Sequence, residues 1–394
     1  MSVTTMTEKA RALLPVYKPL PVDIVAGQGS YLFTDDGRKL LDFTSGIGVN
    51  AFGYGDAETA AAINAALANG VLHTSNILRT QPARQLAERL VELSCADHVF
   101  FCNSGGEANE GALKFARRFA GAVGGPQKHE VIALKGAFHG RLFGTMAATD
   151  RPSFRDQFQP VMPGVRFVSP GDLAELKAAA SSARTAAIIA EPVQGEGGVQ
   201  PLSRAYLQAL RETADAVNAV LIFDEVQCGL GRTGALFAYQ ALDCEPDILT
   251  LAKPLAGGLP MGAILLNERV ANTIQPGDHA TTFGGGVLTS TVALSVVNRI
   301  AEPAFLRTVA GRGEQLANLL GRLLAHPKVK QVRGLGLMWG IELTEPAAPV
   351  QARALEDGLL VLLAGENVIR LLPPLTIGAT ELEQGIELLH GALA

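Results

Sequence analysis

Short apolar runs that alternate with helix-like stretches are the feature that most constrains the fold of this chain. Between residues 99 and 266, seven runs consist mostly of apolar side chains. They are Val99–Cys102, Val131–Leu134, Val165–Val168, Ala186–Ala190, Val220–Phe223, Asp247–Ala252 and Ala263–Leu266. Apolar residues on both alternating faces indicate strands that helices cover on both sides. The pattern therefore predicts an α/β domain with a doubly wound, mostly parallel sheet.

The two ends of the chain follow a different pattern. Tyr31–Thr34 and Lys39–Phe43 flank an Asp-Asp-Gly turn and predict a hairpin. Beyond about residue 288, two helical stretches precede extended runs at Val332–Leu343 and Val368–Leu372. We interpret this part as a smaller α+β domain, which the N-terminal hairpin joins.

The last stretch of the chain predicts a final amphipathic helix. Thr380 and Glu383 have the spacing of a capping box, which would begin this helix. The predicted division of the chain is an N-terminal segment (residues 1–45), a large domain (46–287) and a small domain (288–394).

Charge and composition exclude several classes of protein. The 394 residues carry 33 Lys and Arg against 38 Asp and Glu, a formal net charge of −5, and contain no run of five like charges. A nucleic-acid partner is therefore not expected. The longest uncharged apolar stretch, Pro254–Asn267, is shorter than the roughly 18 residues that span a membrane, so no membrane partner is expected. Four scattered cysteines lack metal-site spacing and favour a cytoplasmic protein without a metal.

A Ser-Gly-Gly turn, Ser104-Gly105-Gly106, follows the first apolar run and precedes a helical pattern that extends to Phe119. Such a turn offers free backbone N–H groups, a hydroxyl and the positive end of a helix dipole, which together suit a phosphate. An ordinary strand-to-helix turn can have the same residues, so the motif alone leaves both interpretations open.

Asp224 and Glu225 end the apolar run Val220–Phe223. An acid pair there resembles the magnesium-binding strand of a nucleotidase, but the chain has no G-x-x-x-x-G-K-[ST] loop. A carboxylate at this point could also be a helix cap or a loop acid. Gly229–Gly234 formally matches G-x-G-x-x-G. A nicotinamide-dependent oxidoreductase is therefore an alternative from another class, although the surroundings fit the dinucleotide motif poorly.

Lys253 follows the run Asp247–Ala252 directly and precedes Pro254 and a glycine-rich loop. Most lysines are solvated surface charges, but an amine at the end of a buried strand can have a lowered pKa and act as a nucleophile. Pyridoxal 5'-phosphate requires a phosphate anchor, a partner for its ring nitrogen and a lysine for covalent attachment. The three motifs together predict this cofactor more specifically than any one of them.

The motifs resemble those of the class III (subgroup II) pyridoxal-phosphate aminotransferases over essentially the whole chain. The segments that carry the resemblance occur in the family's order. They are Asn103–Asn109, Phe138–Arg141, Glu191–Gly198, Phe223–Gln227, Ala252-Lys253, Thr281–Gly285 and Arg370–Pro374. The resemblance implies the PLP-dependent transferase fold type I, a transaminase reaction and a homodimer with shared active sites. The chain departs from the family pattern at Gly106 (usually Ala), at Pro254 and at Gly286-Val287 (usually Asn-Pro).

The resemblance also implies a role for each matching residue. Lys253 would bind the cofactor covalently and move a proton, and Asp224 would hold the pyridinium nitrogen. The other implied cofactor contacts are Ser104, Gly105, Gly106, Phe138, Glu225, Val226 and Gln227, with Thr282 supplied by the partner subunit. The implied substrate contacts are Arg141, Thr281, Glu196 and Arg370, the last two forming a pair that opens for a dicarboxylate.

Within the family, the chain is most similar to the branch that exchanges the terminal amine of N-acylated ornithine with 2-oxoglutarate or glutamate. That branch includes enzymes that act on lysine precursors attached to an amino-group carrier protein, which makes such a carrier an alternative partner. The implied pathway is arginine or lysine biosynthesis. An ornithine or 4-aminobutyrate aminotransferase and an aminomutase of the same fold are the alternatives within this class.

Overall fold

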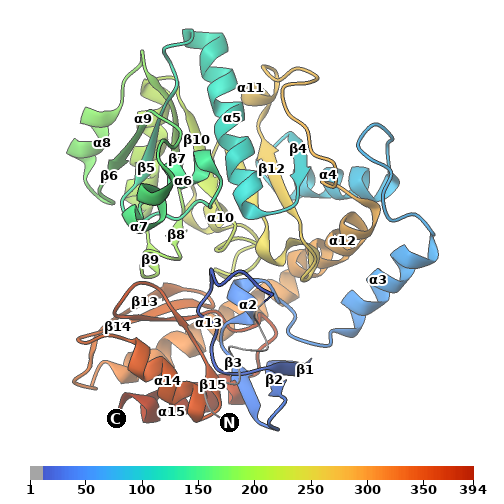
Figure 1. Ribbon diagram of the computed structural model, residues 1–394. Helices are drawn as coiled ribbons and strands as arrows, with labels where there is room; N and C mark the ends of the chain where they lie inside the picture. The colour runs from blue at the N-terminus through green and yellow to red at the C-terminus, as the bar shows by residue number, and fades with distance from the viewer. Residues whose placement is uncertain (1–11) are drawn as a thin grey trace.

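A seven-stranded sheet lies at the centre of the structure, a computed structural model that describes residues 12–394 (Figure 1). All seven apolar runs form its strands, so the predicted sheet is confirmed. In spatial order these are β4 (His98–Cys102), β12 (Gly262–Leu266), β11 (Ile248–Leu251), β10 (Val220–Asp224), β7 (Thr185–Ala190), β5 (Glu130–Leu134) and β6 (Val165–Val168).

Strand direction brings the residues that follow these strands to one edge of the sheet. β12 pairs antiparallel with both β11 and β4, whereas β11, β10, β7, β5 and β6 pair in parallel. β12 therefore runs against the other six strands. The carboxyl ends of β4, β10 and β11 meet at the same edge, where open α/β sheets bind ligands.

Helices cover both faces of the sheet. On β10, Val220 and Ile222 belong to one apolar cluster, which includes residues of α5 (Gly105–Gly124). Leu221 and Phe223 belong to a second cluster, which includes residues of α9 (Arg204–Ala216). Successive side chains of a strand point to opposite faces, so this alternation confirms the doubly wound arrangement.

The remaining helices connect the strands or pack outside them. They are α2 (Ser45–Gly48), α3 (Ala57–Ala68), α4 (Gln81–Leu93), α6 (Phe143–Ala147), α7 (Pro152–Arg155), α8 (Leu173–Ala179), α10 (Ala238–Leu242), α11 (Glu268–Ala271), α12 (Val287–Ala301), α13 (Pro303–Leu323), α14 (Ala348–Glu356) and α15 (Ala379–Leu393), with 3-10 turns η1 (Asp156–Phe158) and η2 (Lys253–Ala256). None of the helices in residues 12–394 combines the length and apolar character that crossing a membrane requires.

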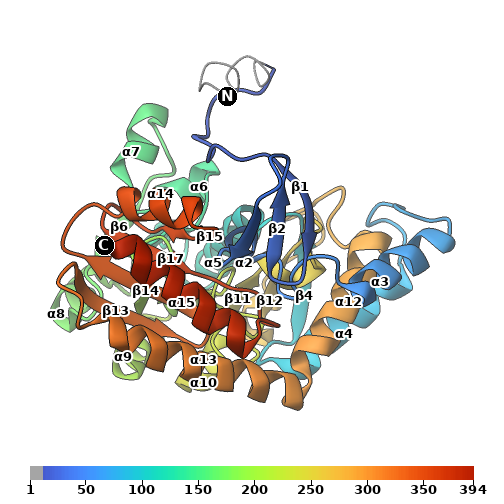
Figure 2. The ribbon, with the colours of Figure 1, turned by 90° about the horizontal axis from the view of Figure 1, so that it is seen from below.

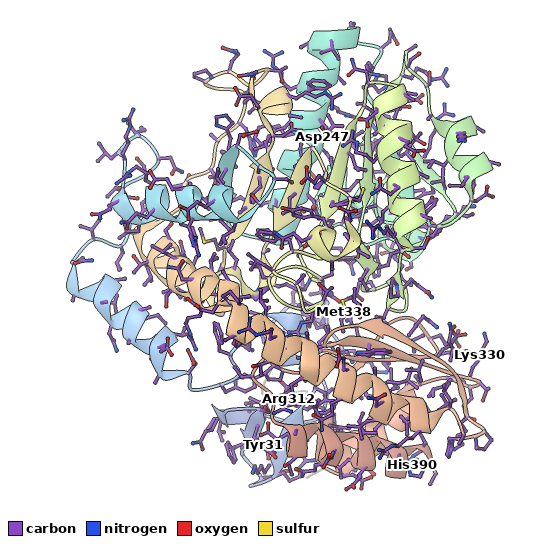
Figure 3. All side chains as sticks on the ribbon, turned by 180° about the vertical axis from the view of Figure 1, so that it is seen from behind. Tyr31, Asp247, Arg312, Lys330, Met338 and His390 are labelled. Carbon is purple, nitrogen blue, oxygen red and sulfur yellow. The ribbon has the colours of Figure 1, made fainter. Side chains whose placement is uncertain are left out.

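The C-terminal part contains a second sheet, with α13, α14 and α15 packed near it (Figure 2). Its order is β13 (Val329–Leu335), β14 (Met338–Leu343), β17 (Val368–Leu371) and β16 (Leu362–Leu363). The predicted extended run at 332–343 is therefore two antiparallel strands joined by a turn at Gly336-Leu337. In Figure 3, Met338 lies between α13 and the large sheet, and Lys330 lies on the outer side.

The predicted N-terminal hairpin is confirmed as β2 (Tyr31–Thr34) and β3 (Lys39–Asp42). It forms a third sheet with β1 (Ile24–Gln28) and with β15 (Leu359–Leu360), which comes from the other end of the chain. This pairing agrees with an N-terminal segment that joins the small domain. The boundaries after residues 45 and 287 stay a prediction.

The predicted capping box of the last helix is wrong. α15 begins at Ala379, with Gly378 as the N-cap residue, so Thr380 lies inside the first turn and cannot cap it. Glu381, rather than Glu383, reaches back, and its Oε2 accepts the backbone N–H of Gly378 at 2.8 Å. The hydroxyl of Ser30 donates to the same oxygen at 3.0 Å, which ties the helix to the N-terminal sheet.

Candidate active site

The carboxyl ends of β4, β10 and β11 border a cavity of about 300 Å³. Most of the predicted site residues line it, although they come from segments far apart in the sequence. They are Ser104, Gly105, Gly106, Phe138, Glu196, Asp224, Val226, Gln227 and Lys253.

The N-terminus of α5 supplies one wall of the cavity. Ser104 is its N-cap residue and accepts the N–H of Glu107 at 3.2 Å. The first N–H groups of a helix have no partner within the helix, so those of Gly105 and Gly106 are available to an anion. A Cβ on Gly105 would lie 2.6 Å from Cγ1 of Val226, so only glycine lets the helix approach Val226 this closely.

Asp224, at the end of β10, is 4% exposed and firmly held. Its Oδ2 accepts the side-chain N–H of Asn109 at 2.6 Å and lies 2.8 Å from Nδ1 of His139. Its Oδ1 accepts the N–H of Val226 at 3.0 Å. These contacts fix the direction in which the carboxylate faces the cavity.

Sequence reasoning missed the residues around Asp224. Asn109 also donates to the carbonyl of His139 at 2.9 Å, and its own oxygen accepts the hydroxyl of Thr250 at 2.6 Å. Asn109 and His139 lie inside the motifs that carried the family resemblance, and this position is the sequence signal by which they could have been found. Thr250 lies beside Asp224 in the register of β10 and β11, and nothing in the sequence pattern marks it.

Glu191 is a second buried carboxyl at the cavity that sequence reasoning did not assign. It accepts the N–H groups of Phe138 at 3.0 Å and Gly195 at 2.9 Å. Burial, opposed by His139 and reinforced by Asp224, raises the pKa of Glu191 to about 7. Its carboxyl group therefore holds the backbone that carries Phe138.

Lys253 begins η2, directly after β11, and its side chain enters the cavity. Burial lowers the pKa of its amine, an effect that the negative charge of Asp224 opposes. Because a neutral amine is a nucleophile and a proton acceptor, this environment suits covalent and acid–base chemistry.

Glu196 and Arg370 form an ion pair beside Lys253. Nη1 of Arg370 lies 2.5 Å from Oε1 of Glu196 and also donates to Oε1 of Gln227 at 3.2 Å. The side chain of Arg370 is 3% exposed, and its Nε–H is buried without a partner among the described residues. The guanidinium therefore retains donor capacity for an incoming carboxylate.

Arg141 is exposed and stands beside the cavity rather than in its lining. Its guanidinium carbon lies 3.3 Å from the ring centroid of Phe154 and 6.0 Å from that of Phe138. Arg141 therefore belongs to the rim next to Phe138.

Two other predicted cofactor or substrate residues, Glu225 and Thr281, do not line the cavity. The carboxyl group of Glu225 accepts the N–H groups of Ala238 and Tyr239 at the start of α10 and does not line the cavity. Thr281 accepts a hydrogen bond from the side chain of Asn103 at 3.1 Å, next to Ser104.

Thr282 lies in a different cavity, of about 410 Å³. That cavity is bordered by residues 73–76 and 78–80 and by Gly284–Gly286. The structure thus separates Thr282 from Lys253 within one chain.

The glycines of Gly229–Gly234 pack against protein. A Cβ on Gly231 would lie 2.9 Å from Cγ2 of Ile300, and one on Gly234 would lie 3.4 Å from Cβ of Ala310. These glycines permit close packing with α12 and α13, so the dinucleotide interpretation has no structural support.

Comparison with known proteins agrees with this geometry. The model of the family described as aminotransferase class-III matches residues 14–393. The chain belongs to this family. It is therefore a transaminase, and class-III aminotransferases depend on pyridoxal phosphate.

Class-III relatives resemble the chain over nearly its whole length. The mitochondrial acetylornithine aminotransferase of Alnus glutinosa is 44% identical over 99% of this chain and 87% of that protein. The acetylornithine aminotransferase of Methanocaldococcus jannaschii is 47% identical over 92% of this chain and 91% of that protein. The ornithine aminotransferase of Toxoplasma gondii, solved with partial occupancy of PLP, has a TM-score of 0.94 at 28% identity, covering 99% of this chain and 93% of that one.

Pyridoxal phosphate fits the residues around the cavity at the carboxyl ends of β4, β10 and β11. The N–H groups at the start of α5 suit its phosphate, the buried carboxylate of Asp224 suits its ring nitrogen, and the amine of Lys253 suits its aldehyde. When bound, pyridoxal phosphate supplies an electron sink for a substrate carbon that loses a proton.

Proposed function

We propose that this transaminase exchanges the terminal amine of an N-acylated ornithine, or of a lysine attached to a carrier protein, with 2-oxoglutarate. The names of the two relatives at 44% and 47% identity support N-acetylornithine as the first choice. The structural observation that carries the proposal is the ion pair between Arg370 and Glu196, because Glu196 lines the same cavity as Lys253.

This pair suits a site that accepts two kinds of substrate. The donor has one carboxylate, remote from its reacting amine, whereas glutamate has a second carboxylate next to the amine. Arg141 at the rim would bind the remote carboxylate of either substrate, through a planar fork suited to carboxylates. Glu196 would neutralise Arg370 while the donor reacts and release it for the α-carboxylate of the acceptor.

Lys253 and Asp224 would carry the chemistry. Nζ of Lys253 would take the proton from the substrate carbon that bears the amine and deliver it to the cofactor carbon on the other side of that nitrogen, a transfer that the lowered pKa of the amine favours. Asp224, ionised beside the ring nitrogen, would keep that nitrogen protonated. Ser104, Gly105, Gly106, Phe138, Val226 and Gln227 would hold the remainder of the cofactor.

Substrate competition tests this assignment. We expect kcat/KM to be highest for N-acetylornithine, compared with ornithine and 4-aminobutyrate, with 2-oxoglutarate as the acceptor. A free α-ammonium would bring an extra charge toward the buried site, whereas an amide is neutral. If ornithine or 4-aminobutyrate is preferred, the substrate assignment fails.

If a carrier-linked lysine is preferred, the pathway is lysine rather than arginine biosynthesis. Turnover without any 2-oxo acid would instead indicate an aminomutase.

We also propose a homodimer in which Thr282 completes the phosphate site of the partner subunit. Thr282 lines a cavity other than that of Lys253 in its own chain, which supports a role in the site of a partner subunit. Large apolar side chains close to it in the sequence or around that cavity are exposed, among them Ile77 (91%), Leu78 and Phe283. Such a patch is typical of an interface.

The proposed compartment is the cytoplasm.

Subunit mixing tests the dimer. A Thr282→Ala chain and a Lys253→Ala chain would each be inactive alone. If the site is shared, a mixed dimer contains one site with both residues intact, so activity returns on mixing. No recovery at any mixing ratio would exclude sharing.

A further inference from the structure

Arg232, in the middle of Gly229–Gly234, is 2% exposed although it carries a charge. No carboxylate of residues 12–394 forms an ion pair with it, and burial lowers its pKa to about 9. A buried charge without an ion-pair partner is costly unless hydrogen bonds compensate it. The partners of Arg232 therefore indicate why a cation stands here.

Those partners lie where the ladder between β14 and β17 ends. In this ladder Trp339 pairs with Leu371 and Gly340 with Arg370. Leu343 donates its N–H to the carbonyl of Asn367, which marks that pair as a hydrogen-bonded one. Hydrogen-bonded pairs recur at every second residue of an antiparallel ladder. Continuing the register makes Leu337 and Pro373 the next hydrogen-bonded pair beyond Trp339 and Leu371.

This last pair cannot exchange both of its backbone hydrogen bonds, because proline has no N–H to donate. The carbonyl of Leu337 would be left without its donor. Arg232 forms hydrogen bonds with the backbone groups of Leu337 and Pro373 that this pair leaves free. Its Nη1 donates to the carbonyls of Leu337 at 3.2 Å and Pro373 at 2.5 Å, and its own carbonyl accepts the N–H of Leu337 at 2.9 Å.

Close packing holds Arg232 in this place. Gly336, in the turn before Leu337, has φ +58°, and a Cβ on it would lie 2.5 Å from the carbonyl oxygen of Arg232. Gly231 has φ +86° and packs against Ile300 and Leu375. The loop and the β13–β14 turn are therefore in direct backbone contact, without room for a side chain between them.

We propose that Arg232 closes the β14–β17 ladder in place of the N–H that Pro373 lacks, and so positions Arg370 for the carboxylate of the amino acceptor. Arg370 lies on β17, three residues before Pro373, which follows the end of that strand, and its guanidinium contacts Glu196 and Gln227 of the cavity lining. Arg232 does not touch the cavity and acts through β17. This inference rests on the proposed role of Arg370.

The two half-reactions, followed separately by the visible absorbance of the holoenzyme, test the inference. Arg232→Met removes the donors while keeping an extended side chain. We expect kcat/KM for 2-oxoglutarate to fall by about 10-fold or more, through KM, and that for N-acetylornithine to change by less than about 3-fold. Arg232→Lys, which keeps one donor group, should restore part of the loss.

Lys128→Met is a matched control. Lys128 is also buried and also donates to two backbone carbonyls, those of Ser182 at 2.9 Å and Val217 at 2.7 Å, but it lies outside the cavity lining. We expect this variant to lower thermal stability while leaving the ratio of the two half-reactions unchanged. A variant that only loses stability would therefore not show the selective loss with 2-oxoglutarate that we expect of Arg232→Met.

The outcomes separate this inference from the proposed function. If Arg370→Lys weakens 2-oxoglutarate but Arg232→Met affects both half-reactions equally or neither, the positioning role of Arg232 is wrong and the role of Arg370 stands. If Arg370→Lys leaves 2-oxoglutarate unaffected, both are wrong. Should Arg232→Met fail to fold, Arg232→Lys provides the test, since a selective rise in KM for 2-oxoglutarate supports the inference and its absence overturns it.

Discussion

Nδ1 of His139 lies 2.8 Å from Oδ2 of Asp224, and the side chain of His139 is fully buried. Its other ring nitrogen has no hydrogen-bond partner among the described residues. An unsatisfied buried polar atom costs about 1–3 kcal/mol, and within residues 12–394 the contact with Asp224 is the polar interaction that offsets this cost for the ring. Asp224 is thus held by a histidine whose polar contact is directed at the site.

Asp224→Ala should lower kcat by about 100-fold or more, which corresponds to roughly 2.7 kcal/mol of barrier. The variant leaves the ring nitrogen of the cofactor without its anionic partner, so cofactor retention should weaken as well. Steady-state kinetics and the visible spectrum measure the two effects. Glu225→Gln is the matched control, because this neighbouring buried carboxyl caps α10 instead of facing the cavity. Equal losses in the two variants would remove the special role of Asp224.

Lys253→Ala should abolish turnover, with a loss of about 1,000-fold or more, because it removes the attachment point and the proton carrier together. In the unaltered protein, borohydride reduction followed by peptide mass spectrometry should place the pyridoxyl group on Lys253. Label on another lysine would show that the assignment is mistaken.

Glu196→Gln should favour glutamate over N-acetylornithine as the amino donor, by about 10-fold in the ratio of kcat/KM values. A neutral amide cannot form the ion pair with Arg370, so the guanidinium stays available to an α-carboxylate. Glu366→Gln, at an exposed position, is the control. An unchanged ratio in Glu196→Gln would contradict the masking role.

Gly105→Ala and Gly106→Ala should have opposite effects on stability. A Cβ on Gly105 would lie 2.6 Å from Val226, whereas the nearest atom to a Cβ on Gly106 is Oγ of Ser104 at 3.9 Å. Alanine at 106 should therefore raise the free energy of unfolding by up to about 1 kcal/mol, because it restricts the unfolded chain. Urea unfolding with an activity assay measures both variants, and a destabilised Gly106→Ala would contradict this geometry.

Stability should fall as the pH rises from about 5 to 8, partly because of Glu225. Burial raises the pKa of this carboxyl from 4.5 to about 8, so the folded protein binds a proton there that the unfolded chain releases. A raised carboxyl pKa stabilises the fold below the unfolded value, and this contribution is lost on the way up to the folded value. Glu225→Gln, which imitates the protonated form, should flatten the dependence of the urea midpoint on pH in this window. An equally steep slope in the variant would exclude Glu225 as its source.

Local pattern was sufficient to predict the strands of the large sheet, because a doubly covered strand needs apolar side chains on both faces. The reversed direction of β12 was not visible in that pattern, since direction depends on how the chain connects. The helix cap was misplaced for a similar reason. Glu381 is fixed by Ser30, which is about 350 residues away in the sequence.

Only part of the candidate site could likewise be predicted from the sequence. Lys253 and Asp224 follow apolar runs and could be located from the sequence, but the bonds of Asn109 to Asp224 and to Thr250 join residues more than 100 positions apart. The outward position of Glu225 could have been anticipated. Successive residues at a strand end point to opposite sides, so Asp224 and Glu225 cannot both face the cavity.

The pairing of β3 with β15 also constrains how the protein is made. Leu41 pairs with Leu359, so the sheet that contains the first hairpin cannot close before residues 359 and 360 have left the ribosome. At about 5–20 residues per second, the hairpin waits roughly 15 to 60 seconds for its partner strand. During this interval the edge of β3 lacks its native neighbour, and a nascent chain of this protein is a candidate for chaperone binding at that edge.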